Sequence, residues 1–182
     1  EHLCRQILGP PPSSAWAALA ELARLIQVQG PPQRPQAASL FGGEEPLERL
    51  MSQGWLHWEQ ERLDFAQPTI RSLFLAYALD DLLDAGREPG GAIKGAEPEA
   101  LLFLYELSSH RQGLLRQLLA QPQDEEHLLL AAQCLAERPA SGPTPGLKGL
   151  PPGIVDPGTY LGLGRAFYRL GRLEEARFAL EE

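Results

Sequence analysis

The sequence predicts a mainly α-helical protein that carries one small β-hairpin. Three observations lead to this fold class. Apolar residues recur at helical spacing through most of the 182 residues. One short stretch, WLHWEQERLDF at 55–65, instead alternates apolar and polar residues around the polar tip EQER, as a hairpin does. Runs rich in proline and glycine separate these pieces from one another.

The chain before the hairpin is predicted to be helical. Residues 1–9 are expected to be the end of a preceding helix. Ser13 or Ser14 can cap the next helix, which is predicted over 15–28 from its Ala and Leu spacing. Residues 37–41 are expected to form one short turn before the glycine pair that follows them.

The hairpin is predicted to lie between two further helices. Pro46 suits the first turn of a helix over 47–53, and Gly54 suits its C-cap. After the hairpin, Pro68 opens a helix with a wide apolar stripe. The stripe consists of Ile70, Leu73, Phe74, Tyr77, Ala78 and Leu82. Helix, helix, hairpin and helix in this order predict a winged-helix-like domain over 10–85.

The second half is predicted to consist of helical hairpins between flexible connectors. A linker at 86–96 precedes a helical hairpin array at 97–138, in which the first helix either stops at Ser108 or continues to Ala120 with a break near 109–112. A linker rich in proline and glycine follows at 139–156. Each hairpin of such an array needs a stacked neighbour to bury its apolar face.

The last segment, 157–182, has the most regular pattern. It carries aromatic, small and turn residues at fixed spacing: Tyr160, Leu163, Gly164, Phe167, Gly171 and Ala176. This pattern resembles a tetratricopeptide repeat. The resemblance implies the start of a repeat array and a protein or peptide partner. Tyr160 and Phe167 are candidate partner-binding residues, and burial in the core is the alternative for both.

The segment from Leu47 to Leu82 resembles the winged-helix subdomain that follows the nucleotide-binding core in STAND-type ATPases, the NACHT and NB-ARC relatives. Phe65, Thr69 and Arg71 match the short sequence motif that this family carries at the junction between the wing and the following helix. Gln67 stands where the family has a phosphate-reading histidine, and Ser72 where it has a glutamate. The resemblance implies Gln67, Thr69 and Arg71 as candidate nucleotide-sensing residues.

No catalytic or metal-binding constellation is predicted. The four histidines do not form a ligand pair at helical spacing, and the acidic cluster of Asp80, Asp81 and Asp84 is expected to be solvated. The phosphate-binding motif GxxxxGK[ST] is absent from the sequence, so no cofactor is expected here. ATP or ADP would belong to the ATPase core of a full-length protein.

Composition and charge restrict the partners. The formal net charge is −8, which disfavours both nucleic acid and an anionic membrane surface. The helix expected to face DNA has Glu44, Glu45 and Glu48 beside a single Arg49, and this charge pattern disfavours DNA as a partner. No apolar run reaches the roughly 20 residues that span a bilayer. The two cysteines, in helical contexts, are expected to be reduced in a cytoplasmic protein.

The two resemblances imply a non-catalytic regulatory and sensor-linking role. The sequence begins without an initiator Met and stops within a helical pattern, so we expect a piece of a longer polypeptide. The resemblance to STAND-type ATPases implies that the ATPase core lies upstream. Ligand binding at the repeats would then bias the packing of the winged helix against that core. One alternative is a winged-helix DNA-binding transcriptional regulator with tetratricopeptide repeats. The other is a tetratricopeptide protein-interaction scaffold.

Overall fold

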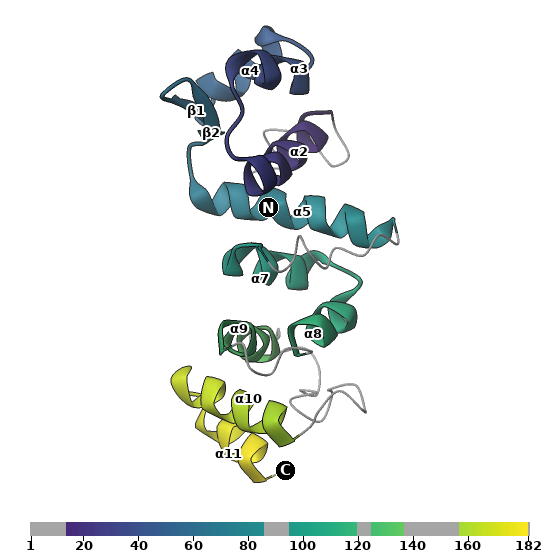
Figure 1. The fold of residues 1–182 in the computed structure, drawn as a ribbon, viewed down its shortest axis with the longest axis vertical. Helices are drawn as coiled ribbons and strands as arrows, with labels where there is room; N and C mark the ends of the chain where they lie inside the picture. The colour runs from purple at the N-terminus through teal and green to yellow at the C-terminus, as the bar shows by residue number, and fades with distance from the viewer. Residues whose placement is uncertain (1–13, 86–94, 120–124, 137–156, 182) are drawn as a thin grey trace. The chain divides into compact units, whose positions relative to one another are not determined.

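The computed structural model describes residues 14–85, 95–119, 125–136 and 157–181 (Figure 1). These residues are mainly helical and contain one two-stranded antiparallel sheet, which confirms the predicted fold class. The chain divides into two compact units between Leu107 and Ser108. The segment predicted to end a preceding helix, 1–9, and the predicted linker at 139–156 lie outside the described residues, as does most of the linker at 86–96.

The first unit opens with three helices, α2 (Ser14–Gln29), α3 (Arg34–Leu40) and α4 (Glu44–Ser52). Gly30 follows α2 with a φ of 87°, which favours glycine, and its N–H bonds back to the carbonyl of Ile26. The single turn expected at 37–41 is wrong, because a longer helix forms there. Proline in the first turn starts α3 earlier, since its fixed φ suits that position.

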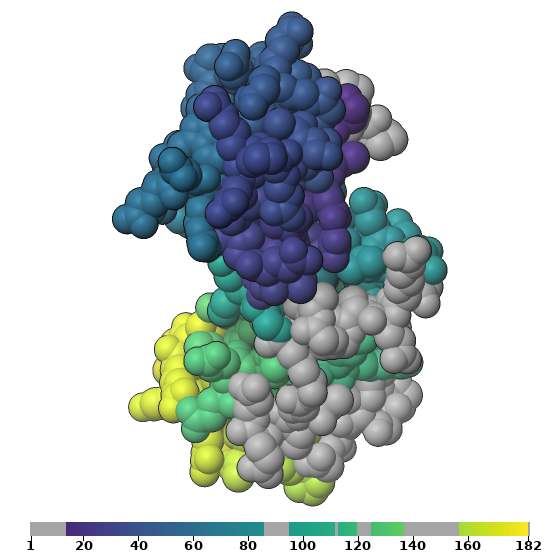
Figure 2. Space-filling view, turned by 45° about the horizontal axis from the view of Figure 1, so that its top comes forward, coloured from purple at the N-terminus to yellow at the C-terminus, as the bar shows by residue number. Residues whose placement is uncertain are grey.

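The predicted hairpin is confirmed. Strand β1 (Leu56–Glu59) pairs with β2 (Arg62–Phe65) in a register that sets Leu56 opposite Phe65 and Glu59 opposite Arg62. The two tip residues between the strands both have positive φ, as a tight two-residue turn requires. Just before α3, Gln33 forms an isolated antiparallel bridge with Arg62, so the tip end of β2 is tied to the α2–α3 connection. Side chains of the hairpin tip project from the surface of the first unit (Figure 2).

Helix α5 (Pro68–Asp84) is the centre of the first unit. It packs against α2, against the hairpin and against α7, and the side chains from Ser72 to Ala76 are all buried. A helix that is apolar nearly all round is stable only when it is covered on several sides. The Phe74 ring lies 5.1 Å from the Trp16 ring and 6.0 Å from the Phe65 ring, measured between centroids. Phe74 therefore joins α2, α5 and the hairpin in one aromatic cluster.

Helix α7 (Pro98–Leu107) belongs to the first unit, although the sequence placed it in an array at 97–138. Its buried residues include Leu101 and Leu104, and the helix packs along α5. Just before α7, Glu97 accepts a 3.0 Å hydrogen bond from the Ser72 hydroxyl and pairs with Arg71. The N-terminal ends of α5 and α7 are thus tied by polar contacts as well as by apolar packing.

The second unit contains α8 (Arg111–Leu119), α9 (Glu125–Ala136), α10 (Pro157–Arg169) and α11 (Leu173–Glu181). The break predicted near 109–112 is present, because α7 and α8 are separate helices. Helices α10 and α11 form a helical hairpin around Gly171, which has a φ of 70°. The Arg172 N–H bonds to the Phe167 carbonyl across that turn, as in a glycine C-cap.

Candidate interaction groove between α9 and α10

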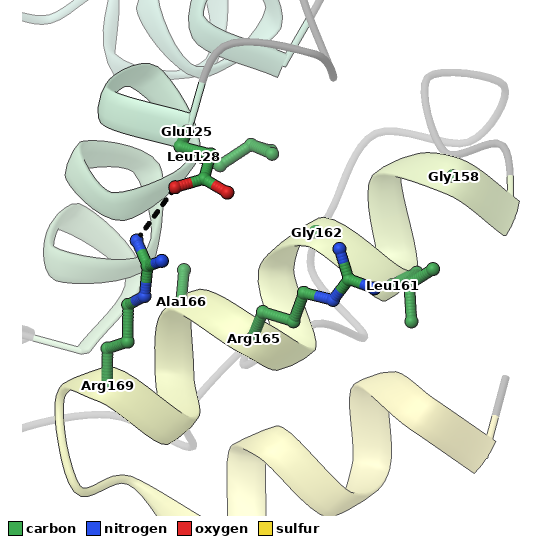
Figure 3. A pocket seen from close by; sticks show the side chains of 8 residues that line it. All are labelled: Glu125, Leu128, Gly158, Leu161, Gly162, Arg165, Ala166 and Arg169. Carbon is green, nitrogen blue, oxygen red and sulfur yellow. Dashed lines mark hydrogen bonds and ion pairs between the residues drawn. The ribbon is translucent and has the colours of Figure 1, made fainter.

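A groove of about 220 Å³ lies between α9 and α10 in the second unit (Figure 3). It is lined by two residues of α9 and six of α10. These residues are Glu125, Leu128, Gly158, Leu161, Gly162, Arg165, Ala166 and Arg169. The lining therefore combines apolar side chains, two glycines and three charged groups.

The apolar part of the groove depends on a close approach between the two helices. A Cβ at Gly162 would lie 2.4 Å from a methyl group of Leu128, a distance that packed atoms do not reach. Glycine at this position lets α9 pack directly on the backbone of α10. Leu128 and Ala166 are buried, whereas Leu161 is 45% exposed. The groove thus has a buried apolar floor and one accessible aliphatic wall.

The charged part of the groove is only half neutralised. Arg165 and Arg169 lie one helical turn apart on α10, and Figure 3 shows Arg169 turned towards Glu125. The Arg169 Nη1 atom lies 3.0 Å from a carboxylate oxygen of Glu125, and both side chains are well exposed. Arg165 forms no ion pair with another residue in the part of the chain that the structure describes. The groove therefore holds two positive charges against one negative charge.

The structure separates the two residues predicted to bind a partner. Tyr160 is half-buried on α10. Phe167 is 1% exposed, so the partner-binding role predicted for it is wrong, and the core alternative holds. The next residue, Tyr168, is 69% exposed, because one step along a helix turns the side chain by about 100°. Sequence reasoning missed Arg165 and its neighbours, although two arginines four residues apart beside an aliphatic residue were a visible signal.

The candidate nucleotide-sensing residues lie at the start of α5. Gln67 occupies the N-cap position without a side-chain capping bond, and both Gln67 and Thr69 are exposed. Arg71 is paired with Glu97 and lies 3.7 Å from the Asp64 carboxylate. A phosphate that approached Arg71 would have to displace these two carboxylates. Arg71 thus links the hairpin, α5 and the segment before α7.

One aspartate of the acidic cluster at the end of α5 has a raised pKa. Partial burial raises the pKa of Asp81, and the negative charges of Asp80 and Asp84 raise it further. Within the described residues, no group of three or more His, Cys, Asp or Glu side chains is arranged to hold a metal ion. A search of the same residues found no helix whose length and apolar character would let it cross a bilayer.

The chain was compared with protein-family models, with characterised proteins and with solved structures. None of them matches. Functional inference therefore depends on the groove, on the fold and on the resemblances stated from the sequence.

Proposed function

We propose that the chain is a non-catalytic regulatory and sensor-linking part of a STAND-type signalling NTPase. In this role, the helical second unit binds a protein or peptide partner, and the winged-helix-like first unit couples that binding to an ATPase core of the same protein. Nucleotide would be held by that core. The observation that carries the proposal is the groove between α9 and α10, in which an accessible aliphatic wall lies beside an arginine without an ion pair among the described residues.

The composition of the groove suits a polypeptide better than a small metabolite. Its volume of about 220 Å³ is below the range of about 300–1,000 Å³ that small-molecule sites occupy. Its exposed residues on α10 include Leu161, Arg165 and Arg169, which follow one another at intervals of four residues and so lie in a row along the helix. A row of this kind offers successive contacts to an extended or helical segment of a partner.

The first unit has the connections that a coupling element needs. Helix α5 is packed against the hairpin through Phe74 and against α7 along its other side. Arg71 adds polar links from α5 to Asp64 in the hairpin and to Glu97 before α7. A displacement of α7 would therefore also shift the hairpin, because packed interiors transmit strain. This supports a conformational mechanism in which partner binding shifts a two-state packing.

The two alternatives are weaker on specific grounds. Helix α4, which would face DNA in a winged-helix regulator, exposes Glu44, Glu45 and Glu48, and its Arg49 lies 3.5 Å from Glu45. Carboxylates on this face repel phosphate. A scaffold that only binds partners would need no winged-helix-like unit. It would also not require the polar contacts through which Arg71 connects the hairpin with the segment before α7.

A display selection tests the binding role. A library of random 12-residue peptides is selected on the purified chain and, in parallel, on the double variant R165E/R169E. Both arginines are exposed, so circular dichroism of the variant should match that of the wild type. We expect peptides enriched on the wild type to be lost on the double variant. Selection of the same peptides by both proteins, or enrichment on neither, would remove the groove as a binding site.

A second measurement separates the alternatives. Fluorescence polarisation with a labelled DNA duplex at low salt should show no binding, and saturable binding there would favour the transcriptional regulator. If a separately expressed ATPase core of the same protein hydrolyses ATP at the same rate with and without the chain, the scaffold alternative is favoured instead.

A further inference from the structure

We infer that the groove between α9 and α10 takes an acidic side chain that lies next to an aliphatic one, and that Glu125 occupies the place of the partner's carboxylate when the groove is empty. The inference rests on the proposed function and names the chemical class of the partner. Glu125 is then an internal competitor that a partner's carboxylate must displace, and this lowers the affinity of the groove for the partner.

The charge of the groove favours a carboxylate. Arg165 and Arg169 lie at i and i+4, a spacing at which like charges destabilise one another. Glu125 lies 3.0 Å from Arg169, and no second carboxylate among the described residues pairs with Arg165. An incoming carboxylate relieves this repulsion, and the planar guanidinium is the side chain best suited to bind it through two hydrogen bonds.

The existing ion pair is easy to replace. The Arg169 and Glu125 side chains are 59% and 69% exposed, and such pairs contribute little to stability because water screens them and long side chains must be ordered. Glu125 lies in the first turn of α9, where the positive end of the helix stabilises its charge whether or not Arg169 is near. A partner's carboxylate can therefore displace Glu125 at low cost.

The apolar half of the groove explains why an aliphatic residue should accompany the acid. Leu161 is 45% exposed, and Figure 3 shows its side chain near that of Arg165. The buried side chains of Leu128 and Ala166 also line the groove. An aliphatic side chain placed on Leu161 removes apolar surface from water on both partners. The same placement brings the next residue of the partner towards Arg165, whose side chain extends towards Leu161 in Figure 3.

Arginine side-chain NMR tests this directly. The probes are the capped dipeptides N-acetyl-Leu-Glu-amide and N-acetyl-Leu-Gln-amide, which differ only in charge and are titrated into the 15N-labelled chain at constant ionic strength. The Nε–H signals of Arg165, Arg169 and Arg177 are assigned with single lysine variants. Arg177 is the matched control, because it is an exposed arginine on α11 that pairs with Glu181 away from the groove.

We expect the glutamate probe to shift the Arg165 and Arg169 signals with an affinity about three- to fivefold higher than that of the glutamine probe, and to leave Arg177 unmoved. The variant E125Q should bind the glutamate probe about two- to fivefold more tightly than the wild type, because the internal competitor is lost. Equal affinity for the two probes would overturn the acidic preference. Unchanged or weaker binding to E125Q would overturn the competitor role.

Failure of this inference can be told apart from failure of the proposed function. If the display selection returns peptides that need Arg165 and Arg169 but lack Asp and Glu, the groove is a binding site without acidic preference. If the selection returns nothing on the wild type, the binding role itself is wrong, and this inference is overturned with it.

Discussion

Replacing Phe74 by alanine should unfold the first unit more readily than any exposed change can. Phe74 is fully buried, and its ring lies within 5.1–6.3 Å of four other rings, measured between centroids. These are the rings of Trp16, Trp55, Phe65 and Tyr77. Truncating a buried Phe to Ala costs about 3–5 kcal/mol from lost burial and the cavity left behind. The tilted and edge-on contacts of Phe74 with Trp16, Trp55 and Tyr77 favour the upper part of this range, so we expect a loss of about 4–5 kcal/mol.

The tryptophans make this loss easy to assign. All three, Trp16, Trp55 and Trp58, lie in the first unit, so their fluorescence reports on that unit alone. In urea, a loss of about 4 kcal/mol moves the midpoint by about 2 M if the slope is near 2 kcal/mol per M. Far-UV circular dichroism reports on both units, and the transition of the second unit should stay where it is in the wild type.

Two matched variants make the result decisive. Phe74→Leu keeps most of the volume and should cost roughly 1.5 kcal/mol. Val28→Ala changes an apolar residue that is 63% exposed and should change the free energy of unfolding by less than about 0.5 kcal/mol. A cost for Phe74→Ala below about 1 kcal/mol, or equal to that of Phe74→Leu, would mean that α5 does not hold the hairpin through this ring.

Two further predictions concern the helix glycines and the acidic cluster. Gly162→Ala should lower the stability of the second unit, because its Cβ would collide with the buried Leu128, whereas Gly164→Ala should be neutral or stabilising by up to about 1 kcal/mol. At Gly164 the clashing atoms belong to Leu180, which is 58% exposed and can turn away. Thermal denaturation followed by circular dichroism should show a lower melting temperature for Gly162→Ala than for Gly164→Ala. An equal loss of stability in the two variants would contradict this reasoning. Asp81→Asn should stabilise the first unit at pH 7. The pKa of Asp81 is raised in the fold, so the native state binds the proton more tightly than the unfolded state, and stability falls as the pH rises from the usual pKa of 3.8 through the raised value. The gain should vanish below pH 3.8 in urea titrations at several pH values, and a gain that persists there would show that charge is not its cause.

Much of the first unit could be predicted because its signals are local. The alternation at 55–65 predicts a hairpin because successive side chains of a strand point to opposite faces, and Leu56, Leu63 and Phe65 are indeed buried. The apolar stripe from Ile70 to Leu82 predicts α5 because side chains three or four residues apart lie on the same face of a helix. The extent of α3 was missed because its short sequence, RPQAASL, carries too few apolar residues to define a face.

The candidate site was only partly accessible from the sequence. The spacing of Leu161, Arg165 and Arg169 on one helix was visible in the printed residues. The neutralising carboxylate was not, because Glu125 lies 44 residues away on another helix. Likewise, the pattern that resembles a tetratricopeptide repeat marks both Tyr160 and Phe167 as aromatic, and only packing shows that Phe167 is buried while Tyr168 is exposed.

Apart from α3, the sequence by itself determined where the described helices lie and where the hairpin turns, because these follow from side-chain periodicity and from proline and glycine within a few residues. Only the tertiary structure decided which apolar faces meet. Helix α7 packs along α5 within the first unit, and α9 packs on the glycine backbone of α10. An apolar stripe gains free energy against any complementary surface, so its partner is chosen by the packing of the whole unit.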